Sequence, residues 1–314
     1  MRSPEELITI HHETVFSEPP VLVHAFAGFV DAGGGVRLAA DHILASCEHT
    51  LVASFDVDEL LDYRARRPRM SFVVDHFASV DMPQILLYDV TDTNGLRFLL
   101  LVGPEPDYQW LRFMAAVDLI VARYNVRLAA GLSAIPWPAP HTRPLGVTIH
   151  GSDPSLVFGI PAVNGEIEVP GHVGAMLELH LGQKGLPSLG VTAQVPHYLT
   201  QFEYPKGAVV LLEGLATGAG VFVSTDGLST AALAADTEVA LQLDGNDEFA
   251  TVVSALEHQY DHIAASTQVA AAGGFGAIDP AEIPDADGIA AQVEEFLAGL
   301  ADSGDQDKDN QAPA

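Results

Sequence analysis

Residues 24–43 read HAFAGFVDAGGGVRLAADHI, and this stretch decides the fold class. An apolar run typical of a buried strand ends in it, a glycine-containing turn follows, and a helical pattern begins near Gly33 or Gly34. The same order of strand, turn and helix recurs along the first two thirds of the chain. Such alternation is typical of an α/β protein with crossover connections.

Six short apolar runs predict strands that are buried on both faces of a mostly parallel sheet. They are VLVHAF (21–26), TLVASF (50–55), QILLYDV (84–90), RFLLLVG (97–103), VRLAAGL (126–132) and PSLGVTAQV (187–195). Helical patterns occupy 34–47, 107–124 and 172–185. After Tyr204 the pattern is helical only, with helices expected from Pro205 onward, at 229–243 and at 246–265.

The charge divides the chain in the same way. Residues 1–206 hold 13 Lys and Arg against 23 Asp and Glu, whereas 207–307 hold 18 acidic residues and no Lys or Arg. We therefore expect an α/β core at 1–218 and a helical appendage at 219–268 that can act as a lid. Residues 269–314 are expected to form a linker, one short helix and a disordered acidic tail.

Composition excludes several classes of protein. The chain has 314 residues, one cysteine (Cys47) and a formal net charge of −28. One cysteine cannot form an internal disulfide, and the charge repels nucleic acid and anionic lipid. No signal peptide and no apolar membrane span are visible, so we expect a cytoplasmic protein. We expect no cofactor or metal, since His258 and His262 share a helix face without a third ligand.

The turn after the first core strand is a candidate ligand site at Asp31, Gly33 and Gly34. Backbone N–H groups at a helix N-terminus attract anions, and glycine leaves them uncovered. The spacing matches neither a dinucleotide fingerprint nor a P-loop. A structural alternative is equally open, in which the glycines allow a tight turn and Asp31 caps the helix.

Two more loops follow predicted strands, and ligands of open α/β sheets gather at such strand ends. IPWPAPHTRP (135–144) presents His141 and Arg143, and VPHYLTQFEYP (195–205) presents His197. A guanidinium can bind a carboxylate or phosphate, and either histidine can act as acid or base. In the alternatives, Arg143 pairs with a neighbouring acid that ties the loop down, and His197 is a buried structural histidine.

The segment YRARRPRM (63–70) gathers four arginines in a loop: Arg64, Arg66, Arg67 and Arg69. Against the acidic background we favour a contact with another subunit or with the acidic region, rather than local charge balance alone.

Several of these motifs together resemble the actinobacterial branch of the PAC2 family, named after proteasome assembly chaperone 2. They are GFVDAGGG, YRARRPR, LLVGPEPDYQW, APHTRP, VPHYLTQFEYP and NDEFATVVSALE, within about residues 20–265. The resemblance implies a three-layer α/β/α, phosphorylase/hydrolase-like core followed by C-terminal helices. It also implies that the glycine turn and the loop at 141–143 face the cleft that phosphorylases use for substrate. By the same analogy, a homotrimer is expected.

Two functions remain open at this level. The leading hypothesis is an oligomeric assembly or binding protein of the PAC2 type, with itself or another protein as partner. The alternative is an enzyme or sensor for a small anionic metabolite, held by the Gly33 and Gly34 amides and Arg143, with His141 or His197 as acid or base. The acidity also fits adaptation to high salt, which concerns environment more than function.

Overall fold

The computed structural model describes residues 2–157, 166–243 and 247–266. Contacts group 1–162 and 169–276 into one compact unit, to which every element below belongs. Of the second unit, 163–168 and 277–314, only residues 166–168 are described, and they adopt no regular secondary structure. Among the described helices, none combines the length and apolar character that a membrane crossing requires.

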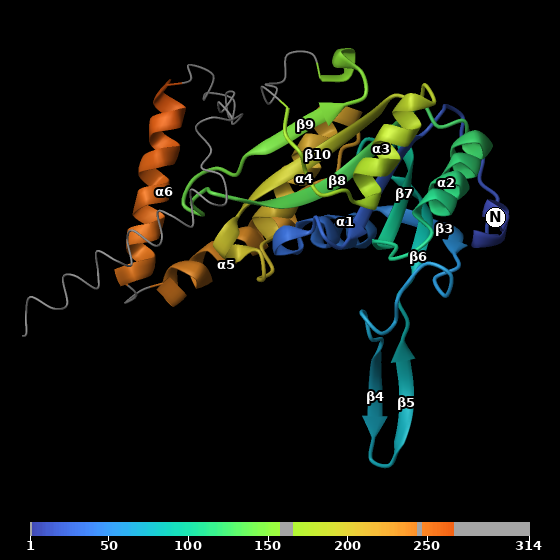
Figure 1. Ribbon diagram of the computed structural model, residues 1–314, viewed down its shortest axis with the longest axis horizontal. Coiled ribbons are helices and arrows are strands. Elements are labelled where there is room, and N and C mark those ends of the chain that lie inside the picture. Colours follow the sequence, from blue (N-terminus) through green and yellow to red (C-terminus); the bar gives the residue numbers. More distant parts are fainter. Residues whose placement is uncertain (1, 158–165, 244–246, 267–314) are drawn as a thin grey trace, which may run out of the picture. The chain divides into compact units, whose positions relative to one another are not determined.

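The main sheet has eight strands in the order β1-β3-β6-β7-β2-β8-β10-β9 (Figure 1). Five of them (β3, β7, β2, β8 and β10) run in one direction, and β1, β6 and β9 run in the opposite direction. The strands are β1 Ile8–Ile10, β2 Val21–Ala27, β3 Glu48–Phe55, β6 Ile85–Thr91, β7 Arg97–Pro104, β8 Leu128–Trp137, β9 Val147–Gly151 and β10 Ser188–Pro196. All six predicted strands are confirmed, and the mostly parallel sheet is mixed at both of its sides.

Helices cover both faces of this sheet, as expected for a three-layer α/β/α fold. The α-helices are α1 Gly35–Ser46, α2 Trp110–Tyr124, α3 Val173–Gln183, α4 Pro205–Ala219, α5 Asp226–Leu243 and α6 Asp247–Ser266. Short 3-10 helices are η1 Pro4–Leu7, η2 Ala32–Gly34, η3 Pro154–Val157 and η4 His197–Leu199. Each predicted helix within the described residues is present. The predicted linker, short helix and tail at 269–314 lie outside the described residues.

Strand β2 shows why a continuous apolar run was the right signal. Val21 and Val23 pack in a core cluster with residues of α1 and α4, whereas Leu22 and Phe26 pack in a second cluster with residues of α2 and α3. Successive side chains of a strand point to opposite faces, so a strand with helices on both sides needs apolar residues at nearly every position. The helices α1 and α4 therefore share one face, and α2 and α3 share the other.

The arginine segment differs from its prediction. Its last two residues, Arg69 and Met70, belong to a strand instead of a loop, because β4 (Arg69–Val73) pairs with β5 (His76–Asp81) in a separate two-stranded sheet. Figure 1 shows this hairpin as a ribbon of its own. Every residue of both strands is exposed. The proposed division into a core at 1–218 and an appendage at 219–268 stays a prediction.

Candidate functional site

Three of the predicted site segments follow neighbouring parallel strands. The strands β2, β8 and β10 lie side by side and run in the same direction. The glycine turn follows β2, the loop with His141 and Arg143 follows β8, and His197 follows β10. The structure thus brings these segments to one edge of the sheet, where ligands of α/β folds commonly bind.

Asp31 caps the start of α1. Its carboxylate oxygen Oδ1 accepts a hydrogen bond from the backbone N–H of Val36 at 2.7 Å and from that of Arg37 at 3.3 Å. Burial raises the pKa of Asp31 to about 6, and the two backbone hydrogen bonds oppose that rise. The observed contacts of Asp31 are therefore those of a helix cap, which is the structural alternative given for it above.

The backbone N–H groups of the turn already donate hydrogen bonds to carbonyl groups of the chain. The N–H of Gly33 donates to the carbonyl of Thr200 at 2.9 Å, and the N–H of Gly34 donates to the carbonyl of Asp31 at 3.0 Å. Gly33 and Gly34 have φ values of +64° and +63°, a left-handed conformation that favours glycine. Contrary to the expectation from the sequence, these amides are not available to an anion in this structure. The glycines are required by the turn itself.

His141 is buried and is held by two groups that follow β10. Its backbone N–H donates to the Tyr198 hydroxyl oxygen at 2.8 Å, and its ring Nδ1 lies 2.9 Å from the same oxygen. Lys206 Nζ donates to the His141 carbonyl at 2.9 Å. Burial lowers the pKa of His141 and raises that of Tyr198 to about 12. A neutral imidazole that accepts the phenol proton at Nδ1 satisfies both contacts.

Lys206 and Tyr204 connect this edge to α5 through Asp236. Lys206 Nζ lies 3.3 Å from Asp236 Oδ2, and the Tyr204 hydroxyl donates to Asp236 Oδ1 at 2.9 Å. Asp236 was not a candidate in the sequence, because no local pattern links a mid-helix aspartate to a lysine in the first turn of another helix 30 residues away.

Arg143 connects the edge to α6. Its Nε and Nη2 donate to the two carboxylate oxygens of Asp261 at 2.9 and 2.7 Å, and its Nη1 lies 3.1 Å from Glu257 Oε1. Thr142 also donates to Glu257. The hydrogen bond from Arg143 lowers the pKa of Asp261. Its planar fork therefore holds acidic side chains of the same chain, as the alternative reading foresaw.

The sequence indicated only weakly that two acidic residues of α6 would act together. Glu257 and Asp261 are four residues apart in a predicted helix and so share one helix face. The histidines His258 and His262 have the same spacing one position further along the helix, and they do not bind Arg143.

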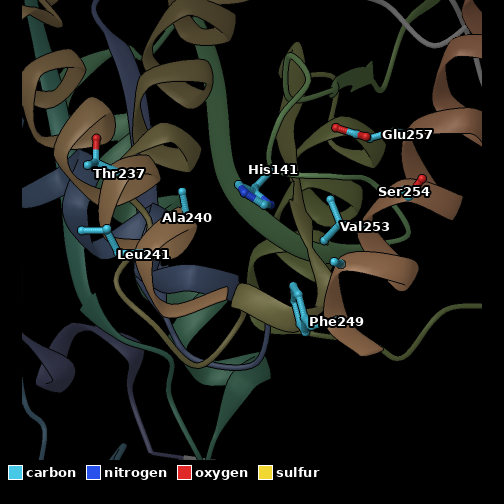
Figure 2. A pocket seen from close by; sticks show the side chains of 9 residues that line it. His141, Thr237, Ala240, Leu241, Phe249, Val253, Ser254 and Glu257 are labelled. Carbon is cyan, nitrogen blue, oxygen red and sulfur yellow. The ribbon is translucent and has the colours of Figure 1, made fainter. Parts of the chain in front are cut away.

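A cavity of about 460 Å³ opens between α5, α6 and His141. Figure 2 shows the α5 side chains on one side of His141 and the α6 side chains on the other. Its lining is largely apolar and consists of His141, Thr237, Ala240, Leu241, Phe249, Ala250, Val253, Ser254 and Glu257. The only formally charged side chain in this lining, Glu257, is already paired with Arg143.

A second cavity, of about 420 Å³, shares Phe249 in its lining with the first. Tyr198, Leu199 and Phe202 line it from the segment after β10, together with Glu203 and with α5 residues Ala235, Glu238 and Val239. The ring of Phe249 also packs edge to face on Tyr198, with ring centroids 5.0 Å apart. We call the two cavities together the α5–α6 groove. Aromatic and aliphatic groups dominate its lining, which suits apolar occupants.

The remaining predicted residues lie outside this groove. His197 is exposed rather than buried, and its ring packs on Tyr198 with centroids 5.2 Å apart. The arginine segment follows β3, which is separated from β2 by β6 and β7 in the sheet. Of its arginines, Arg66 pairs with Asp107 at 3.2 Å.

A further polar cluster bridges β8, β9, β10 and α3. His150 Nδ1 lies 3.0 Å from Glu178 Oε1, and the Ser133 and Thr192 hydroxyls are 2.7 Å apart. The gap from His150 Nε2 to the Thr192 hydroxyl is 3.4 Å, which is long for proton transfer. These contacts tie α3 to the sheet.

Comparison with known proteins identifies the family. A sequence profile described as the PAC2 family matches residues 25–243, well over half of the chain. The chain belongs to the PAC2 family. The match runs from β2 to the end of α5, so the wall of the groove formed by α6 lies beyond it. The resemblance seen in the sequence is thereby confirmed.

Solved structures agree with this membership. A Mycobacterium tuberculosis protein of unknown function shares 42% identity over 82% of this chain and 91% of its own, with a TM-score of 0.78. A Corynebacterium glutamicum protein of unknown function shares 34% identity over 81% and 97%, with a TM-score of 0.77. A proteasome-assembly chaperone homologue from Mycobacterium tuberculosis has the same fold at 24% identity, covering 74% and 99%, with a TM-score of 0.68. None of the curated proteins compared matches the chain.

Proposed function

We propose that this PAC2-family protein is an assembly or binding protein that forms homo-oligomers and receives an apolar protein segment in the α5–α6 groove. The single observation that carries the proposal is the composition of that groove, whose lining is largely apolar and in which Glu257 is paired with Arg143 and Glu203 with Arg37. A groove of this kind binds through apolar contact area rather than through a charge clamp.

The family context supports this reading. A family named after an assembly chaperone, and a fold shared with a proteasome-assembly chaperone homologue, both favour protein partners. We place the protein in the cytoplasm, since its lone Cys47 is free and buried. A homotrimer is the expected oligomer by analogy with phosphorylase-like folds.

The contacts seen in the structure weaken the alternative in which the protein binds a small anion. The Gly33 amide donates to the Thr200 carbonyl and the Gly34 amide to the Asp31 carbonyl, and Arg143 already holds Asp261 and Glu257. An anion would have to displace these contacts and would meet the acidic surface of α6.

A peptide-display selection tests the proposal. We expect the full chain to enrich peptides rich in aromatic and aliphatic residues, and Ala240→Asp, which places a charge in the groove lining, to lose them. Ala231→Asp is the matched control, because it makes the same change on an exposed part of α5 away from the lining.

Two results would refute the proposal. In the first, the selected peptides bind Ala240→Asp as well as they bind Ala231→Asp. In the second, inorganic phosphate or a nucleotide raises the melting temperature of the wild-type chain and this rise disappears in Arg143→Ala, which would favour the small-anion reading.

A further inference from the structure

The α5–α6 groove is acidic as well as apolar. Residues 207–266, which form α4, α5 and α6, carry nine acidic residues and no Lys or Arg. The apolar part of the groove is open to solvent, since Leu241 in the first cavity is 70% exposed and Phe202 in the second is 58% exposed. An uncovered apolar surface with charged borders is typical of a docking site for a protein segment.

The first cavity keeps a negative charge despite its ion pair. Glu257 lines this cavity and binds Arg143, but the same guanidinium also binds Asp261, one turn further along α6. One positive charge therefore serves two carboxylates, and one negative charge is left over. Figure 2 shows Glu257 among the α6 side chains of this cavity. The side chains of Glu257 and Asp261 are partly exposed, so an occupant of the groove can reach the remaining charge.

The second cavity repeats this arrangement. Glu203 lines it and binds Arg37, which also binds Asp41 of its own helix α1. Here too, two carboxylates share one guanidinium, and Glu238 adds a further carboxylate to the lining. Each cavity therefore combines apolar groups with carboxylates that outnumber the arginine beside them.

These charges restrict the chemistry of the occupant. An acidic peptide, a phosphate group or a nucleic acid would meet carboxylates at both cavities and would be repelled. A segment with Lys or Arg beside its apolar groups would instead supply the positive charges that the groove lacks. At partly exposed sites such charges speed association and fix the orientation of docking more than they add affinity.

The walls of the groove also favour one conformation of the occupant. Both walls are helices, whose backbone N–H and C=O groups bond within the helix, so the groove presents side chains rather than a strand edge. An extended segment lying on side chains would leave its own backbone groups unpaired. A helix satisfies its backbone internally and can bury one apolar face in such a groove.

We propose that the α5–α6 groove binds a basic amphipathic helix of a partner protein, with its apolar face in the two cavities and its Lys or Arg side chains beside Glu203 and Glu257. This inference rests on the proposed function, which makes the groove a site for an apolar protein segment, and it names the charge and conformation of that segment.

The test uses three fluorescein-labelled model peptides of about 18 residues, a length that allows a helix to form. All three have Leu at the spacing of one helix face, and their other positions are mainly Lys, Gln or Glu. A scrambled Leu/Lys peptide has the same charge without an apolar face, and so measures the general attraction of a cation to a chain with a net charge of −28. Fluorescence anisotropy with the full chain gives the dissociation constants.

We expect the Leu/Lys peptide to bind with a dissociation constant about 10-fold lower than that of the Leu/Gln peptide, mainly through faster association. The Leu/Glu peptide and the scrambled peptide should bind more weakly than the Leu/Gln peptide. At an ionic strength of about 0.5 M the preference for Lys over Gln should fall to about 2-fold or less, because salt screens partly exposed charges.

A charge variant locates the effect. Glu203→Gln with Glu257→Gln leaves one carboxylate for each arginine, and should reduce the preference for the Leu/Lys peptide to about a third or less of its wild-type value. Glu5→Gln with Glu18→Gln is the matched control, because it removes the same charge at exposed positions outside the groove lining and should keep the preference. Unchanged binding of the Leu/Gln peptide shows that both variants are folded.

Three results would overturn the inference: equal binding of the Leu/Lys and Leu/Gln peptides, a scrambled peptide that binds as tightly as the Leu/Lys peptide, or a preference that the control variant loses as fully as the charge variant. The proposed function can survive each of them, since the Leu/Gln peptide would still bind the wild type and be lost in Ala240→Asp. The proposed function fails separately, if Ala240→Asp retains the Leu/Gln peptide or if no Leu peptide binds the wild type.

Discussion

Replacement of Asp31 by Asn should stabilise the protein at neutral pH, although Asp31 caps a helix. Burial raises the pKa of this carboxyl from 3.8 to about 6 in the folded protein. An unfolded chain therefore releases the proton near pH 4, whereas the folded chain retains it until about pH 6. The folded state binds more protons across this window, so the contribution of Asp31 to stability falls as pH rises from about 4 to about 6.

The size of this effect follows from the pKa difference. About two pKa units correspond to about 3 kcal/mol of unfolding free energy, as an upper value, at and above about pH 7. In Asp31→Asn the amide oxygen still accepts the hydrogen bond from the Val36 N–H, but no charge has to be buried. The variant should match the wild type near pH 4 and exceed its stability by up to about 3 kcal/mol near pH 7.5.

Urea unfolding at these two pH values measures the difference. The exposed Glu18, which lies outside α1 and does not act on Asp31, provides the control Glu18→Gln, for which we expect a small change at both pH values. A stability difference for Asp31→Asn that does not grow with pH would refute the burial argument. A variant less stable than the wild type near pH 7.5 would show that the negative charge of the cap outweighs its desolvation.

Three further predictions concern the helices and the core. Arg143→Ala should leave the sheet intact but increase amide hydrogen exchange in α6, whose carboxylates it binds, while exposed Arg127→Ala should not. Gly103→Ala should destabilise by at least about 2 kcal/mol in urea unfolding, because φ is +149° and a Cβ would lie 2.4 Å from a backbone oxygen of the adjacent segment. Gly95→Ala, with φ of +83° and open space around it, should cost only about 1 kcal/mol. Phe113→Ala should cost about 3–5 kcal/mol, because this α2 side chain is fully buried in the core between α2, α3 and the sheet.

The sequence predicted the central sheet well for a physical reason. Strands β2, β7 and β8 place side chains in both core clusters, so apolar residues occupy most of their positions and the runs are distinct from helical periodicity. Strands β1 and β9 were not predicted, because they are edge strands of three and five residues with partly exposed side chains. Short edge strands carry little apolar pattern.

The hairpin was missed because its turn lacks the usual residues. Met70 and Phe72 alternate with Ser71, which indicates a strand, but the turn at Val74 and Asp75 contains no glycine or asparagine. The cluster of arginines nearby was instead interpreted as a loop.

The site was only half predictable for a different reason. The strand-end rule placed Asp31, His141 and Arg143 correctly along one edge of the sheet. Whether Arg143 is free or paired depends on α6, and its hydrogen bond to Asp261 joins residues that are 118 positions apart. No local pattern indicates which acid of a predicted helix will reach a given loop, so the anion site and the ion pair had similar support from the sequence.

The same contacts explain the uneven charge of the chain. Arg143 and Lys206 are among the 14 basic residues, and both hold acidic side chains of the region that has no Lys or Arg of its own. Part of the charge asymmetry is therefore complementarity within one molecule. Added salt should therefore weaken the attachment of α5 and α6 to their own core, which amide hydrogen exchange in these helices at rising ionic strength would measure.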